Sequence, residues 1–237
     1  MLTERIPSHE LMDDDLPASD LAIILDDLWR INRRFGGISG TMKLLEIFFR
    51  HTGAHPVRIL DIGAGDGRLA ATVAQRLNEQ AISAKCIALE RDLAHLRHGR
   101  ESARGLGRIA ADAFALPFCP GSFELVTCNL FLHHFSGHEA REALHSMADV
   151  ASEAVLINDL DRRWLPYVLI RYAPFMARHP ISRFDGAASV RQAYNRTELL
   201  RLAEDAEVGK PEWVELPCFR HGLILWKTNS VPRGRPV

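Results

Sequence analysis

The sequence predicts an α/β fold, a doubly wound sheet in which strands alternate with helices. From position 56 onward, short apolar runs are separated by segments whose apolar residues recur at helical spacing. This alternation favours parallel strands with helices on both faces of the sheet. A chain of 237 residues suits one such domain with an appendage. We therefore expect a seven-stranded, mostly parallel sheet with an N-terminal helical cap.

The expected cap covers residues 1–55 and holds two helices. Apolar residues in the first helix recur at i, i+3, i+4 and i+7, and Ser19 is its expected N-cap. Gly36-Gly37 ends this helix, and a second helix is expected over 41–51. Because residues 1–18 are polar and acidic, we expect them to lie loosely before the fold begins.

The main domain is expected over residues 56–230, followed by a loose tail at 231–237. The segment 160–195 interrupts the alternation and is rich in aromatic residues, which fits either a cover over a substrate or an insertion that buries its own aromatic face. The other predicted elements are strands at 57–60, 86–89, 108–110, 123–128, 154–157, 212–216 and 219–227, and helices at 68–80, 93–99, 139–150 and 197–207.

Composition excludes several classes of protein. Hydrophobic residues make up 47% and charged residues 25% of the chain, the balance of a globular protein rather than a disordered one. The formal net charge of -1 supplies no global field for a nucleic acid, so no nucleic acid partner is expected. The four cysteines form no C-x-x-C pair, and the apolar runs are too short for a membrane span. Since the acidic N-terminus is no signal peptide, we expect a cytoplasmic protein.

The strongest local feature is the segment Asp61-Ile62-Gly63-Ala64-Gly65-Asp66-Gly67, which lies between a predicted strand and a predicted helix. Glycines at such a turn allow positive φ angles and let a ligand approach the backbone closely. In a doubly wound sheet, this turn lies at the carboxyl end of the first strand, where ligands bind. Three alternating glycines are more than a plain turn requires, so the segment predicts a nucleotide-binding loop.

A nicotinamide-dependent reductase is the first alternative for this loop. The dinucleotide fingerprint G-x-G-x-x-G fits Gly63 and Gly65, but its third position is Arg68. The next candidate acid, Glu90, lies somewhat further along the chain than the ~20 residues typical of that fingerprint. An acid there could hold a ribose diol in either case, so the glycine spacing is what argues against the reductase.

Four motifs in order resemble those of the class I S-adenosylmethionine-dependent methyltransferases, in the small-molecule (quinone or phenolic) subgroup. Their glycine turn is matched by Asp61 and the three glycines that follow it. Residues 110–118 resemble the family's D-A-x-x-L-P-F stretch, 122–126 its fourth strand, and 129–135 the L-H-H-F ending of quinone-type enzymes. The resemblance covers about residues 56–160 and implies a Rossmann-like sheet.

The resemblance also implies S-adenosylmethionine as the cofactor and assigns its contacts. Glu90 would hold the ribose diol, Asp112 would accept a hydrogen bond from the adenine amine, and Asn129 would face the cofactor or the transferred methyl group. Asp61 would act through the loop toward the amino group of the methionine end. The full set of implied cofactor contacts is Asp61, Gly63, Ala64, Gly65, Glu90, Arg91, Asp112, Ala113 and Asn129.

The adjacent histidines His133 and His134 follow the fourth predicted strand. One of two such neighbours usually points inward, so we expect a structural His133 and a catalytic His134 that removes the proton of the acceptor. His134 and His138 have the i, i+4 spacing of a metal pair, but no third ligand is evident, and no metal site is expected.

The expected function is methyl transfer to a small, largely apolar, aromatic or quinone-like acceptor, most simply O-methylation of a phenol or quinol. Carbon methylation of a quinone precursor and a non-catalytic S-adenosylmethionine-binding partner protein remain alternatives. A narrower resemblance is to bacterial methyltransferases associated with polyketide-derived phenolic products, and it implies a role in secondary metabolism. The segments that carry it are Asn32-Arg33-x-x-Gly36-Gly37, 158–160 and 183–186. The sequence indicates neither the acceptor's identity nor the oligomeric state.

Overall fold

The computed structural model describes residues 2, 4–99, 101, 103–172 and 177–227, and it confirms the predicted α/β class. Seven strands form one sheet in the order β3-β2-β1-β4-β5-β7-β6, parallel except at β7, which is antiparallel to both of its neighbours. The expected tail at 231–237 lies outside the described residues. The strands are β1 (Val57–Ile62), β2 (Ala84–Glu90), β3 (Gly107–Ala110), β4 (Phe123–Asn129), β5 (Ala151–Leu160), β6 (Lys210–Leu216) and β7 (Arg220–Trp226).

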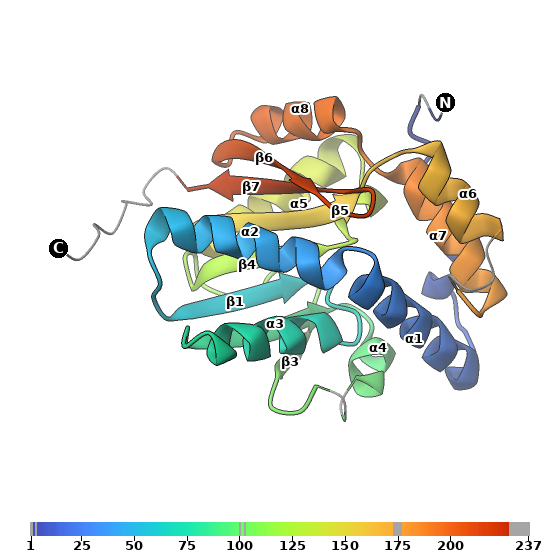
Figure 1. The fold of residues 1–237 in the computed structure, drawn as a ribbon, viewed down its shortest axis with the longest axis horizontal. Coiled ribbons are helices and arrows are strands. Elements are labelled where there is room, and N and C mark those ends of the chain that lie inside the picture. The colour runs from blue at the N-terminus through green and yellow to red at the C-terminus, as the bar shows by residue number, and fades with distance from the viewer. Residues whose placement is uncertain (1, 3, 100, 102, 173–176, 228–237) are drawn as a thin grey trace.

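Helices cover both faces of this sheet (Figure 1). Apolar residues of α2 and α3 pack on one face, and those of α5 and α8 on the other, so the hydrophobic core has two halves. The helices are α1 (Ala18–Arg34), α2 (Gly37–Thr52), α3 (Arg68–Glu79), α4 (Leu93–His98), α5 (Gly137–Val150), α6 (Trp164–Tyr172), α7 (Pro180–Gln192) and α8 (Arg196–Ala206), with 3-10 turns η1 (Leu11–Asp13) and η2 (Leu132–His134).

Four helix starts differ from the sequence prediction, and the simplest case is α5, which begins at Gly137 rather than at 139. Ser19 lies inside α1 and does not cap it, because the helix already begins after Pro17. The second helix begins at Gly37 rather than at 41, since only Phe35 and Gly36, the latter in the left-handed conformation at φ +84°, separate it from the end of α1. Helix α8 begins at Arg196 rather than at 197 and is capped by Asn195, through a reciprocal capping box with Glu198.

The prediction that residues 1–18 lie loosely is wrong for the part that the structure describes. Glu10 is 5% exposed and accepts hydrogen bonds from Ser189 and Gln192 of α7. The backbone N–H groups of Leu11 and Met12 donate to the carboxylate of Asp185. A polar segment can therefore be ordered by polar partners, which hydrophobic periodicity does not reveal.

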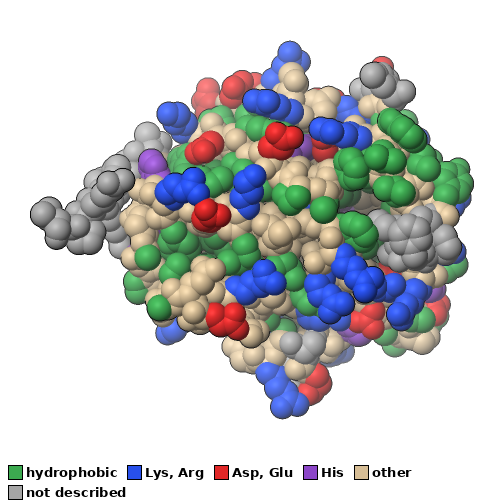
Figure 2. Space-filling view, in the orientation of Figure 1, with side chains coloured by type: hydrophobic (Ala, Val, Ile, Leu, Met, Phe, Trp, Pro, Cys, Tyr) green, Lys and Arg blue, Asp and Glu red, His purple; other side chains and the backbone are tan. Residues whose placement is uncertain are grey.

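Helices α6 and α7 occupy the segment that interrupts the alternation of strands and helices, of which 173–176 lie outside the described residues. Part of its aromatic character faces outward, since Trp164 is 61% and Tyr172 is 68% exposed. Figure 2 shows hydrophobic side chains gathered on the side of the molecule where α6 lies. The inner side of the pair packs against α1 and the N-terminal segment. No described helix is both long and apolar enough to span a membrane.

We expect Asp185→Ala to release the N-terminal segment from α7. The substitution removes two charge-assisted hydrogen bonds, so the free energy of unfolding should fall by about 1–3 kcal/mol. Hydrogen exchange at the amides of Leu11 and Met12 should become faster. Asp14→Ala is the control on the same segment, because it removes only an exposed ion pair with His9. Unchanged exchange at both amides in Asp185→Ala would contradict this packing.

Candidate active site

A cavity of about 780 Å³ lies where the carboxyl ends of β1, β2 and β4 meet α1, the N-terminal segment and the α6–α7 pair. Ligand sites in open α/β sheets occur at this edge. All ten residues that the sequence singled out for the cofactor or for catalysis line this one cavity, namely Asp61, Gly63, Ala64, Gly65, Glu90, Arg91, Asp112, Ala113, Asn129 and His134.

The glycine loop forms one wall of the cavity. Gly63, Gly65 and Gly67 have φ angles of +64°, +56° and +79°, a region that L side chains rarely adopt. A Cβ at Gly63 would lie 2.2 Å from the Phe131 ring, so the packing at this position also requires a residue without a side chain. A Cβ at Gly65 would meet nothing within 4 Å, which leaves the backbone there open to a ligand.

Glu90, at the end of β2, is tied to this loop. Its Oε2 accepts a hydrogen bond from the N–H of Gly65 at 3.0 Å, and its Oε1 accepts one from the N–H of Asp92 at 3.1 Å. The N–H of Ala64 also donates to the carbonyl of Leu89 at 3.0 Å. The carboxylate therefore lies beside the bare backbone of the loop, with lone pairs left over for a diol.

Asp61 lies at the carboxyl end of β1 and is 5% exposed. Burial raises the pKa of Asp61 to about 7, and the nearby Glu90 carboxylate acts in the same direction, although a hydrogen bond from Thr127 opposes them. This carboxyl group is thus poised between its neutral and ionised forms near neutral pH. A cation bound in the cavity would favour the ionised form.

Three more of the predicted cofactor contacts follow strand ends: Asp112 and Ala113 come after β3, and Arg91 comes after β2. The Oδ1 of Asp112 accepts from the N–H of Phe114 at 2.9 Å, which orients the exposed carboxylate at the rim of the cavity. Ala113 is buried, and its carbonyl accepts a hydrogen bond from Ser146 of α5. Arg91 is exposed at the rim, next to Glu90.

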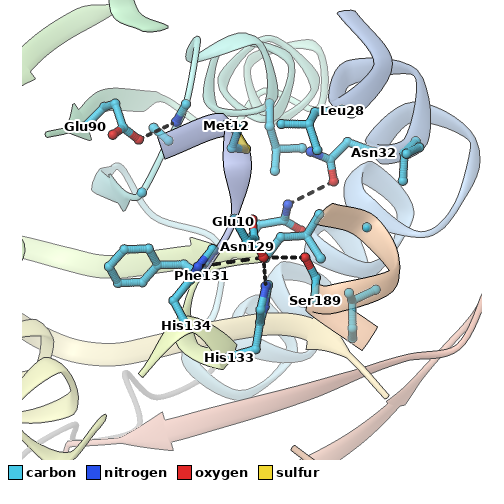
Figure 3. Close-up of a pocket in the computed structure, with 18 of the residues that line it drawn as sticks. Glu10, Met12, Leu28, Asn32, Glu90, Asn129, Phe131, His133, His134 and Ser189 are labelled. Atoms are coloured by element: carbon cyan, nitrogen blue, oxygen red, sulfur yellow. Dashed lines mark hydrogen bonds and ion pairs between the residues drawn. The ribbon is translucent and has the colours of Figure 1, made fainter. Parts of the chain in front are cut away.

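Asn129 joins three segments that are far apart in sequence. Its Nδ2 donates to Oδ1 of Asn32 at 2.9 Å, which Figure 3 shows as a dashed line between β4 and α1. Its Oδ1 accepts from Nη1 of Arg220, at the start of β7, at 3.0 Å. Sequence reasoning missed Arg220 entirely, although the Asn32-Arg33-x-x-Gly36-Gly37 motif marked the opposite side of this contact.

His133 is almost fully buried between two carboxylates. Its Nδ1 lies 2.6 Å from Oδ1 of Asp159, and its Nε2 lies 3.8 Å from Oε1 of Glu10. Burial alone would lower the pKa of His133, but the charge and hydrogen bond of Asp159, together with Glu10, outweigh it and raise the pKa to about 9. The pKa of Asp159 falls to about 2, since the attraction of the imidazolium overcomes its burial. His133 is therefore an imidazolium near neutral pH.

His134 stacks on this imidazolium and lines the cavity. The two ring centroids are 4.4 Å apart at an interplanar angle of 26°. The side chain of His134 is 29% exposed, against 2% for that of His133, so His134 is the more accessible of the two histidines to an acceptor in the cavity. Figure 3 shows both imidazoles close to Glu10 and Ser189.

Glu10, His133 and His134 are also the one group within the described ranges whose ligand atoms are spaced for a metal, all within 4.8 Å of one another. The i, i+4 partner considered in the sequence, His138, instead pairs with Glu142 on α5. The Oε1 of Glu10 already accepts hydrogen bonds from α7, and a proton on His133 occupies the nitrogen that a metal would need. The three side chains thus form an ionic group, in which the buried Nε2 of His133 has no hydrogen-bond partner among the described residues.

We expect the stability that His133 contributes to be lost as the pH rises from about 7 to above 9. Its pKa in the fold, about 9, exceeds the ~6.5 of an unfolded chain, so the folded protein binds an extra proton in this range and loses stability as the pH rises. The difference in free energy of unfolding between wild type and His133→Gln should shrink on the order of 2 kcal/mol between pH 7 and pH 9.5. A difference that stays constant or grows would contradict an imidazolium at this position.

The comparisons with known proteins agree on the family. Residues 59–153 match a family model described as a methyltransferase domain. The chain is 37% identical over 84 residues, 34% of its length, to malonyl-[acyl-carrier protein] O-methyltransferase from Methylococcus capsulatus. It is 40% identical over 90 residues, 35% of its length, to the protein of the same name from Geobacter sulfurreducens. These matches cover 29% and 31% of the two proteins, less than a third of the curated relatives.

Among solved structures, an S-adenosylmethionine-dependent methyltransferase from Aquifex aeolicus superimposes with a TM-score of 0.61 at 16% identity, covering 89% of this chain and 98% of that one. This likeness shows that the two chains share a fold. The matched family model identifies residues 59–153 as a methyltransferase domain, and the seven-stranded sheet has the fold of an S-adenosylmethionine-dependent methyltransferase. This domain, together with structural neighbours that hold S-adenosylmethionine or S-adenosylhomocysteine, supports S-adenosylmethionine as the cofactor.

Proposed function

We propose that this protein transfers the methyl group of S-adenosylmethionine to an oxygen of a small, largely apolar acceptor, a phenol or quinol. The observation that carries this proposal is that one cavity combines an acidic, glycine-walled crevice with an apolar chamber. The crevice contains Glu90 and Asp112, whereas the chamber is bounded by α1, α6 and α7. Asn129 and His134 also line this cavity, which includes both the crevice and the chamber.

The crevice suits the polar parts of the cofactor. Glu90 offers lone pairs to the ribose diol, and Asp112, held by the N–H of Phe114, offers one to the adenine amine. The open backbone at Gly65 accommodates the methionine end without steric obstruction. In this arrangement Asp61 balances the ammonium group, and Ala64, Arg91 and Ala113 complete the contacts along the wall.

The chamber suits a flat, apolar acceptor. Its lining includes Leu28 and Trp29 of α1, Leu169 and Ile170 of α6, and Val190 of α7. Such a surface favours an aromatic ring over a charged metabolite. Helices α6 and α7 would then act as the substrate cover, and the N-terminal segment would close the remaining side and exclude water.

The reaction is an in-line displacement at the methyl carbon. A lone pair of the acceptor oxygen forms the new O–C bond while the S–C bond breaks and its electron pair stays on sulfur, which gives a methyl ether and S-adenosylhomocysteine. His134 takes the phenolic proton as the nucleophile forms. His133 cannot do this near neutral pH because it already carries a proton, so it positions His134 by stacking. Catalysis rests mainly on alignment and exclusion of water.

An oxygen acceptor is also supported by the curated relatives, which are named for O-methylation of a malonyl group carried on a protein. Polyketide chemistry supplies both phenols and acidic acyl groups, so a role in secondary metabolism is consistent with this proposal.

We expect the affinity for S-adenosylhomocysteine to fall as the pH is lowered from 8 to 5.5. The pKa of Asp61 is about 7, so acid neutralises the carboxyl group that faces the cofactor's ammonium, and each pH unit well below 7 should cost up to about tenfold in affinity. Calorimetric titration across this range measures the slope. Asp61→Asn should bind more weakly at pH 8 and show a flat profile.

Adenosine serves as the matched control for this titration because it lacks the amino acid end. Its affinity should vary little between pH 5.5 and 8. If S-adenosylhomocysteine bound to the wild type with no pH dependence, the assignment of Asp61 would be wrong.

We expect His134→Gln to reduce methyl transfer by about 10²–10⁴-fold, the usual worth of general base catalysis. The measurement is release of S-adenosylhomocysteine over a panel of phenols and quinols, with the affinity for the cofactor determined in parallel. The activity of the variant should recover partly at high pH, where the acceptor ionises without help. His138→Gln is the control, since that histidine is exposed on α5 and does not line the cavity. Full activity of His134→Gln on an identified acceptor would refute the general-base role.

A further inference from the structure

We propose that the cavity contains a carboxylate-binding subsite centred on Arg220. The inference deepens the proposed function, on which it rests, by naming a charged group that must be part of the bound ligands. Arg220 lines the cavity together with Asn129, yet this residue is only 3% exposed. Nothing in the sequence motifs of the cofactor site includes this residue.

Arg220 makes hydrogen bonds only to neutral acceptors. Its Nε donates to the carbonyl of Phe35 at 2.6 Å, its Nη1 to Oδ1 of Asn129 at 3.0 Å, and its Nη2 to Oδ1 of Asn32 at 3.1 Å. A guanidinium has five N–H donors, so two remain, one on each terminal nitrogen. Two donors on adjacent nitrogens match the two oxygens of a carboxylate.

The charge of Arg220 has no ionic partner among the residues that the structure describes. Arg162, the other buried arginine in those ranges, forms a bidentate ion pair with Glu198 at 2.7 and 2.8 Å. Burying a cation without a counter-ion is costly, and here burial lowers the pKa of Arg220 to about 10 while the more distant Asp159 acts in the opposite direction. A bound anion would supply the missing charge.

The Asn32-Arg33-x-x-Gly36-Gly37 motif is built around this guanidinium. Asn32 and Phe35 lie at the C-terminal end of α1, and each accepts one hydrogen bond from the Arg220 guanidinium. A Cβ at Gly36 would lie 2.9 Å from Cδ of Arg220 and 2.9 Å from the carbonyl of Pro217. The glycine thus permits the close approach of β7, and the motif holds Arg220 in one orientation facing the cavity.

Two ligands of the proposed reaction could bring a carboxylate to this point. One is the methionine end of S-adenosylmethionine, and the other is an acidic group on the acceptor. The recognition chemistry is the same in both cases, so the experiment separates the sources by removing the carboxylate from one ligand at a time.

The informative variant is Asn32→Asp, which places a carboxylate 3.1 Å from Nη2 of Arg220 and retains the acceptor that Asn129 uses. This internal counter-ion should keep or raise the thermal midpoint of the free protein while it competes with the ligand's carboxylate. Arg220→Met removes the charge, with circular dichroism to verify the fold. Arg34→Ala is the control: it removes an exposed cation of α1, the helix of Asn32, and should not change the affinity for any of the ligands.

Calorimetry with S-adenosylhomocysteine and its decarboxylated analogue, which keeps the amine, tests the cofactor as the source. Thermal shifts at saturating S-adenosylhomocysteine, with 4-hydroxybenzoate against 4-hydroxybenzamide, test the acceptor. In one of these pairs, both variants should bind the ligand that has the carboxylate about tenfold or more weakly than the wild type does. Their affinity for the matched ligand without the carboxylate should stay within twofold of the wild-type value. The pair that responds identifies the source.

The subsite is refuted if the wild type binds S-adenosylhomocysteine but, in both ligand pairs, neither variant loses more affinity for the acid than for the matched ligand without the carboxylate. Failure of the wild type to bind S-adenosylhomocysteine at all would instead refute the proposed function. The two failures are therefore distinguishable.

Discussion

The hydrogen bond from the N–H of Gly65 to Glu90 is the contact on which the rest of the site depends. It fixes the glycine loop, whose backbone would otherwise have several positive-φ conformations available, against the end of β2. It also holds a carboxylate beside a wall without side chains. A crevice with a carboxylate at its wall, the proposed site of the ribose, follows from two neighbouring parallel strands that end at the same edge of the sheet.

The other half of the cavity is organised by charge rather than by a loop. His133 is an imidazolium between Asp159 and Glu10, and it supports His134 at the cavity surface. Arg220 is a second buried cation, held by neutral oxygens of α1 and β4. The first cation is balanced within the protein, whereas the second is left for a ligand. This contrast makes the chamber selective by charge as well as by apolar shape.

The sequence was sufficient for the parts of the site that depend on local chain geometry. The order of strands and helices follows from periodicity, and the loop around Gly63 and Gly65 follows from the need for positive φ angles. These glycines, Glu90 and Asp112 were all expected near a nucleotide, and the structure places them on one cavity. Each lies at the end of a strand, where topology alone determines its position.

What the sequence could not predict is the part built from distant segments. Glu10 belongs to a polar stretch that has no periodicity, yet it is buried against Ser189 of α7. Arg220 lies 188 positions from Asn32, and neither residue indicates the other without the fold. Helix boundaries failed for a related reason, because Gly36 acts through its backbone conformation and Asn195 through side-chain capping, and a hydrophobic pattern contains neither.

The most direct test of the central claim is a side-by-side calorimetric titration of the purified protein with S-adenosylhomocysteine and with NADH, repeated on Glu90→Gln. We predict binding of the nucleoside thioether alone, weakened about tenfold or more by the loss of the carboxylate charge at the loop. Tight binding of NADH with no heat from S-adenosylhomocysteine would contradict the account, since the same crevice would then serve a dinucleotide.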